Sequence, residues 1–140
     1  MKKKILLVDD DYAVLQSLAR VLIAENYLPL LAKDGKNALE ILGANHVDLI
    51  MLDLNMPVRD GWQTFQTLSR DYPLLPIIII TARSNQRFPA LAAGVGALME
   101  KPLDFPHLLE TIRALLEEPA EARLARVSGR LSQFHFYPSA

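Results

Sequence analysis

The chain has 140 residues, which is the length of one domain and too short for two complete ones. Fifteen Lys and Arg residues against sixteen Asp and Glu residues leave a formal net charge of −1, which argues against direct nucleic-acid binding through a basic surface. Cysteine is absent, which excludes disulfides, thiolate metal sites and cysteine nucleophiles.

No segment has the length of a membrane span or a secretory signal. The longest apolar run away from the termini, residues 77–80, is much shorter than a membrane-spanning helix. Only four apolar residues follow the basic start before Asp9 interrupts them. We therefore expect a soluble cytoplasmic domain with no membrane contact, and the apolar fraction of 51% predicts a packed core.

Five short apolar runs alternate with amphipathic stretches. The runs are mostly continuous, which is typical of strands covered on both faces, and they comprise residues 5–8, 27–32, 49–52, 77–80 and 97–99. Between several of these runs, and after the last one, apolar residues recur at helical spacing, as in Val14, Leu15, Leu18 and Leu22, in Ala38, Leu39 and Leu42, and in Leu108, Ile112 and Leu115. This alternation predicts an α/β fold with a parallel sheet and helices on both faces.

Turn and capping residues agree with these boundaries. We expect Asn26 to close the first helix, Asp34-Gly35 and Asp60-Gly61 to form turns, and Asp104 to cap the last helix. Pro29 lies inside the second run and lacks a backbone N–H group, so that run is expected to be an edge strand. A doubly wound sheet of order 2-1-3-4-5 places its second strand at the edge.

Acidic residues follow two of the predicted strands. The first strand runs into Asp9-Asp10-Asp11, and the third ends at Asp53. Ligands of open parallel sheets bind beyond the carboxyl ends of the strands, so these acids should converge on one crevice. Crowded carboxylates need a compensating cation, and oxygen ligands without His or Cys favour Mg²⁺. The alternative, that Asp10 and Asp11 only cap the next helix, does not account for Asp53.

Two further polar residues end predicted strands. The fourth strand is followed by Thr81, and the fifth leads into Glu100-Lys101-Pro102. Taken singly, Thr81 is typical of a strand end and Lys101 of a solvated surface. Together with the acids they supply a hydrogen-bond donor, a positive charge and a cation site, which are the groups that a phosphoryl group requires.

Four motifs in order resemble the receiver domain of two-component response regulators. They are residues 5–11, residues 52–57 followed by Asp60-Gly61, Thr81-Ala82, and Lys101-Pro102. The resemblance covers about residues 3–118 and leaves residues 119–140 as a tail. It implies a flavodoxin-like, doubly wound, five-stranded parallel sheet of order 2-1-3-4-5. The tail carries Ala120, Leu124, Val127 and Leu131 at helical spacing, and we expect an extra amphipathic helix or a docking arm.

The same resemblance implies a role for each site residue. Asp53 would accept a phosphoryl group from a histidine kinase or phosphotransfer protein, in a reaction that needs Mg²⁺ or Mn²⁺. Besides Asp53, the metal would be held directly by Asp10, through water by Asp9, and by the backbone carbonyl of Asn55. Thr81 would hydrogen-bond the phosphoryl group. Lys101 would pair with Asp53, and the Lys101–Pro102 bond would be cis.

Arg83 and Asn55 occupy positions that, in the family, influence the lifetime of the phosphorylated state; alternatively, Arg83 is an exposed loop residue. Two departures affect the output face. Leu98 replaces the family's usual Tyr or Phe, and the interval from Thr81 to Lys101 is shortened between residues 84 and 93, where Pro89 restricts the fourth helix. We expect phosphorylation chemistry without the aromatic switch, with the tail serving as an interaction surface.

The expected partners are the phosphoryl donor, an unidentified effector, and a second copy bound through the fourth-to-fifth-helix face or the tail. On this interpretation the chain catalyses only its own phosphorylation and dephosphorylation. Two alternatives compete with it. A small aspartyl-phosphate phosphatase would use the Asp9-x-Asp11 pattern but leaves Asp53 unexplained. A phosphorylation-independent interaction module would have no need of Asp10, Asp53, Thr81 and Lys101.

Overall fold

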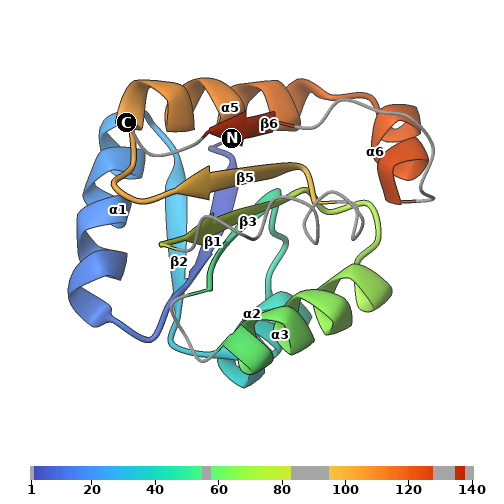
Figure 1. Cartoon of the computed structure of the whole chain (residues 1–140), viewed down its shortest axis with the longest axis horizontal. Helices are drawn as coiled ribbons and strands as arrows, with labels where there is room; N and C mark the ends of the chain where they lie inside the picture. Colours follow the sequence, from blue (N-terminus) through green and yellow to red (C-terminus); the bar gives the residue numbers. More distant parts are fainter. Residues whose placement is uncertain (1, 55–57, 83–94, 128–134, 138–140) are drawn as a thin grey trace.

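The computed structural model describes residues 2–54, 58–82, 95–127 and 135–137 (Figure 1). Within these ranges six parallel strands form one sheet, in the order β2-β1-β3-β4-β5-β6. The strands are β1 (Lys4–Val8), β2 (Leu28–Ala32), β3 (Leu49–Asp53), β4 (Ile77–Thr81), β5 (Ala97–Glu100) and β6 (His135–Tyr137). The predicted order of the first five strands, 2-1-3-4-5, is confirmed.

Helices pack on both faces of this sheet, because side chains alternate between the two faces along each strand. The helices are α1 (Tyr12–Ala24), α2 (Gly35–Ala44), α3 (Val58–Asp71), α5 (Phe105–Glu117) and α6 (Ala120–Val127). In β1, Ile5 and Leu7 belong to the core that contains α1 and α5 residues. Leu6 and Val8 belong to the opposite core, under α2 and α3. None of the helices in the described ranges is long and apolar enough to cross a membrane.

Short-range signals place the ends of the helices. Asn26 follows α1 with a φ of 68°, a left-handed conformation that asparagine tolerates. Asp104 caps α5, where its side chain accepts a hydrogen bond from the His107 N–H group. Pro29 lies in β2, which is an edge strand of the sheet as predicted. These local rules held because each depends on one residue's own chemistry.

The two predicted turns lie at helix starts, so both interpretations were wrong. Asp34 is the N-cap of α2 and accepts a hydrogen bond from the Asn37 N–H group at 2.7 Å, which makes Gly35 the first helical residue. Asp60 and Gly61 lie inside α3. The glycines serve close packing, because a Cβ atom at Gly35 would collide with Thr64, and one at Gly61 with the Leu54 side chain.

The sixth strand was not predicted. The expectation of five strands was therefore one short, although the predicted tail helix is present as α6. Figure 1 shows the chain passing from β5 through α5 and α6 before it returns to the sheet as β6. A crossover of this length is what two neighbouring parallel strands require. β6 has only three residues, too few for a periodic pattern to reveal it.

Candidate functional site

The carboxyl ends of four strands bring the predicted site residues to one edge of the sheet. Asp9 follows β1, Asp53 ends β3, Thr81 ends β4 and Lys101 follows β5. The register aligns Asp53 with Ile80, and Thr81 with Glu100. The Lys101 N–H group donates to the Thr81 carbonyl oxygen at 2.8 Å, so the backbone holds the two strand ends together.

Asp53 and Lys101 form an ion pair. The Lys101 Nζ atom lies 2.6 Å from the Asp53 Oδ2 atom, and the peptide bond that follows Lys101 is cis. The Asp53 side chain is only 3% exposed and that of Lys101 is 24% exposed. A carboxylate this deeply buried is removed from the water that would solvate it, so a nearby positive charge is needed to stabilise it. The ammonium of Lys101 supplies that charge.

Asp9 is the second buried acid of the cluster and is 2% exposed. Its Oδ1 atom accepts a hydrogen bond from the Asp11 N–H group at 3.0 Å. Its Oδ2 atom is buried, and no N–H or O–H group of the described residues donates to it. Burial, together with the adjoining Asp53 carboxyl, raises the pKa of Asp9 to about 7, while the Asp11 amide and Lys101 oppose the rise.

The other two acids after β1 have different surroundings. Asp11 is the N-cap of α1, and its Oδ1 atom accepts hydrogen bonds from the N–H groups of Ala13 and Val14. The capping alternative is therefore correct for Asp11, and this carboxylate is already engaged where a phosphatase would need a free acid. Asp10 is exposed next to the buried pair.

The carboxylate oxygens of the described residues fit a hard cation, although they are too few to surround one by themselves. Within the described ranges, no group of three or more Asp, Glu, His or Cys side chains converges closely enough to hold a metal. Asp9 and Asp53 nevertheless place two carboxylates beside the Lys101 ammonium, and no described residue donates a hydrogen bond to the buried Oδ2 atom of Asp9. Mg²⁺ matches this set, because it binds through one or two carboxylates and keeps several waters.

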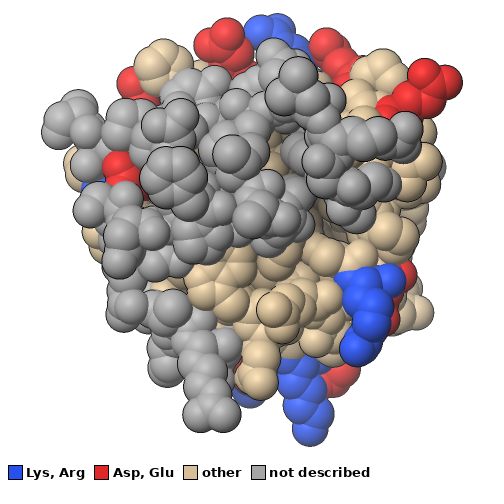
Figure 2. Space-filling model, turned by 45° about the vertical axis from the view of Figure 1, so that its right-hand side comes forward, with Lys and Arg blue, Asp and Glu red and all other residues tan. Residues whose placement is uncertain are grey.

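Of the remaining predicted residues, the structure describes Leu98 but not Asn55 or Arg83. Asn55 and Arg83 lie outside the described residues. Leu98 is completely buried in the core under α2 and α3. Glu100, for which the sequence predicted no role, is buried at the end of β5, and only its position beside Lys101 could have singled it out. On the face shown in Figure 2, positive and negative residues both border the tan surface.

The fold is that of a doubly wound α/β domain with acidic residues at the carboxyl ends of its strands, and the sequence places it in a family. Residues 5–113 match the family profile of the response regulator receiver domain. The chain therefore belongs to this family, the receiver domains of two-component response regulators.

Several similar curated relatives carry the name response regulator MprA. The protein from Mycolicibacterium vanbaalenii is 39% identical over 118 residues, which cover 83% of this chain and 51% of that protein. The protein from Mycobacterium bovis is 38% identical over 135 residues, which cover 91% of this chain and 59% of that protein. The chain thus spans little more than half the length of these relatives.

Solved structures agree on the fold. The CheY-like receiver domain protein from Methanospirillum hungatei superposes with a TM-score of 0.77 at 28% identity, over 86% of this chain and 98% of that one. The chemotaxis protein CheY4 from Vibrio cholerae gives a TM-score of 0.75 at 27% identity, over 82% and 99% of the two chains.

Proposed function

We propose that the chain is a phosphoacceptor switch in which Asp53 receives a phosphoryl group from a histidine kinase or a phosphotransfer protein. The observation that carries this proposal is the buried Asp53–Lys101 ion pair, with Asp9 beside it, in a member of the receiver family. In this proposal the signalling unit comprises residues 3–118 and operates in the cytoplasm. An effector reads its state.

The transfer is a substitution at phosphorus. One oxygen of the Asp53 carboxylate attacks the phosphorus atom while the bond to the donor's imidazole nitrogen breaks, and the electron pair leaves with that nitrogen. The product is an acyl phosphate on Asp53, and the donor is left as a neutral imidazole because its other ring nitrogen carries a proton when the bond to phosphorus breaks. Lys101 pairs first with the carboxylate and then with the phosphoryl oxygens. Thr81 donates its hydroxyl hydrogen to one of those oxygens.

Asp9, Asp10 and Asp53 are the side chains that would hold Mg²⁺, or Mn²⁺ in its place, with the carbonyl of Asn55. The bound ion would neutralise charge shared between the carboxylate and the incoming phosphoryl group. Arg83 and Asn55 would influence how long the acyl phosphate lasts. Leu98, which replaces the usual aromatic residue, leaves the readout to other surfaces, including the tail at residues 119–140.

The test is incubation with acetyl phosphate and Mg²⁺, followed by intact-protein mass spectrometry and peptide mapping. We expect the mass of one phosphoryl group on the peptide that contains Asp53, and no gain after chelation of Mg²⁺ or in Asp53→Asn. Asp48→Asn is the matched control, because Asp48 precedes the other end of the same strand. Phosphorylation that persists in Asp53→Asn would contradict the proposal.

A further inference from the structure

The outer edge of β5 is covered by the chain's own tail. β5 pairs with β4 on one side and with β6 on the other, and the register joins Ala97 to His135, Leu98 to Phe136 and Met99 to Tyr137. Without β6, the N–H and C=O groups along that edge of β5 would have no strand beside them. An uncovered edge of this kind is a template for pairing with another extended chain.

This edge presents main-chain groups alone. The side chains of Ala97, Leu98 and Met99 are completely buried between the helical layers. An incoming strand is therefore recognised through backbone hydrogen bonds, in the manner of strand addition. The requirement on the ligand is an extended segment whose N–H groups toward β5 are intact, which excludes proline at those positions.

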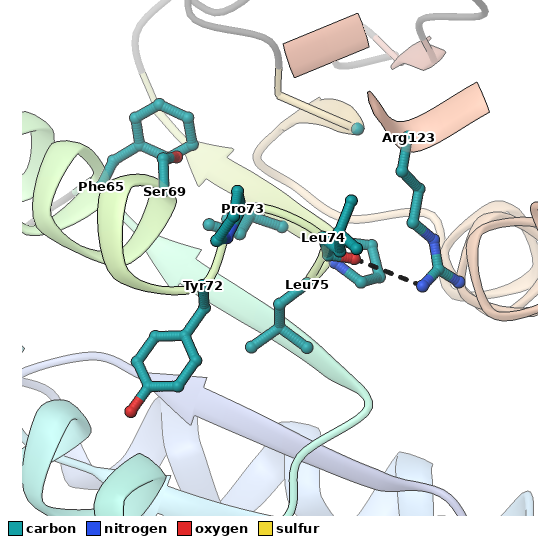
Figure 3. Close-up of a pocket in the computed structure, with 10 residues that line it drawn as sticks. Phe65, Ser69, Tyr72, Pro73, Leu74, Leu75 and Arg123 are labelled. Carbon is teal, nitrogen blue, oxygen red and sulfur yellow. Dashed lines mark hydrogen bonds between the residues drawn. The ribbon is translucent and has the colours of Figure 1, made fainter. Parts of the chain in front are cut away.

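The tail is anchored before it reaches β5. The Arg123 guanidinium of α6 donates to the Leu74 carbonyl at 3.3 Å (Figure 3). It also donates to the Leu115 carbonyl at 2.8 Å. It also lies near Glu118, with 3.6 Å between Nε and Oε1. These contacts tie α6 to the end of α5 and to the segment before β4. Detaching β6 therefore requires no movement of α6.

Among the described residues, three pairs hold β6 on the sheet, whereas the other neighbouring strands are joined by four or five pairs each. Short edge pairings open at a small free-energy cost, well below that of global unfolding. The segment is thus suited to leave the edge and return to it. Any copy of the chain carries the same segment, which fits this register.

We propose that the outer edge of β5 is a strand-acceptor site, closed in cis by His135–Tyr137 and open in trans to the same segment of a second copy. In cis the tail is an autoinhibitory cover, and in trans it links two copies by strand exchange. The tether favours the cis pairing until the protein concentration approaches the effective concentration of the tail, on the order of millimolar. The proposal is independent of chemistry at Asp53.

A labelled synthetic peptide of residues 131–140 provides the test, by fluorescence anisotropy against the full chain. In the double variant Phe136→Pro/Tyr137→Pro the tail cannot cover β5, because successive N–H groups face opposite sides and both are removed. We expect this variant to bind the peptide at least tenfold more tightly than wild type does. A peptide carrying the same two prolines should bind neither protein, and Glu121→Ala, on an exposed position of α6, should behave as wild type.

Amide hydrogen exchange shows whether the edge has been uncovered. We expect faster exchange in the double variant at the amides within Ala97–Met99 that point toward β6, whereas those bonded to β4 stay protected, and unchanged exchange in β1 and β3 is the sign of an intact fold. Continued protection of the amides that point toward β6 would overturn the cover. Rapid exchange there without peptide binding would overturn the acceptor site, and equal binding by both proteins would overturn gating by the tail.

Sedimentation at increasing concentration tests the second copy as occupant. Wild type should form dimers at the highest concentrations, whereas the double variant should stay monomeric because its tail pairs with no edge. Strand exchange would be overturned by equal dimer dissociation constants in the two proteins. It would also be overturned if wild type formed no dimers up to millimolar concentration.

Discussion

At the residue scale, the described part of the site sets two buried carboxylates against the ammonium of Lys101. Asp9 and Asp53 are both buried, and Lys101 is the cation that contacts Asp53 directly. Burial strengthens each interaction because little water screens it. The loss of a single charge here should therefore have a larger effect than the loss of one on the surface.

Replacement of Lys101 tests this balance. Lys101→Met keeps most of the side-chain length and removes the charge, so we expect the rate of acyl phosphate formation from acetyl phosphate to fall roughly 100-fold. The rate of mass gain measures the effect. Lys33→Met, at an exposed lysine, is the control and should react at the wild-type rate. A Lys101→Met protein that reacts as fast as wild type would remove Lys101 from the mechanism.

Asp48, which lies away from the site, makes a pH-dependent contribution to the stability of the fold. Burial acts to raise its pKa, but hydrogen bonds from the Lys4 N–H group and from His46, both at 2.8 Å, leave the pKa below its usual 3.8. A lowered folded-state pKa adds stability above the unfolded-state value, and that stability is lost as the pH falls through the folded-state value.

Asp48→Asn should therefore lower the free energy of unfolding by about 1 kcal/mol near neutral pH. The difference from wild type should shrink below the unfolded-state pKa and vanish under strongly acidic conditions, as followed by urea denaturation across the pH range. A difference that stayed constant down to the most acidic conditions would contradict this assignment.

At the element scale, α2 and α3 approach each other closely at Gly35. A Cβ atom there would collide with both the hydroxyl and the methyl group of Thr64. Gly35→Ala should therefore lower the free energy of unfolding by about 1–3 kcal/mol, because the helices must separate. A Cβ atom at Gly43 in the same helix would meet open space, so Gly43→Ala should raise the free energy of unfolding by up to about 1 kcal/mol. Thermal or urea unfolding of both variants measures the contrast, which would be absent if the approach did not matter.

At the scale of the whole molecule, Arg123 joins segments that are distant in the sequence. Its guanidinium binds the carbonyl of Leu74, 49 positions away, and the carbonyls of Leu115 and Leu116 at the end of α5. Its position near the carbonyl end of α5 also suits a cation, because the helix dipole is negative there. We infer that α6 is an integral part of the folded unit.

Arg123→Ala should accelerate amide exchange throughout α6 and lower the free energy of unfolding by about 1–3 kcal/mol, because part-buried carbonyls lose their donor. Glu121→Ala removes a neighbouring exposed charge and should leave both measurements at wild-type values. If α6 stayed protected in Arg123→Ala, the apolar contacts of the helix would be sufficient to hold it.

Much of the fold followed from local chemistry. Continuous apolar runs predicted the first five strands, and Pro29 predicted which of them lies at the edge. The carboxyl ends of parallel strands lie on the same side of the sheet, so the positions of the apolar runs were enough to group Asp9, Asp53, Thr81 and Lys101. The Asp34-Gly35 and Asp60-Gly61 pairs were wrongly predicted as turns, since Asp followed by Gly is compatible with a turn and with a helix start.

What the sequence determined by itself was the alternation of strands and helices and the polar residues that follow the strands, because side-chain type and spacing encode both, while the order of the sheet was implied by the resemblance to the receiver family. Only the tertiary structure decided that His135–Tyr137 joins β5 and that Arg123 clamps α6 to the body. The physical reason is that both contacts use main-chain groups of distant segments. Every residue carries such groups, so no pattern of side chains marks where they will meet.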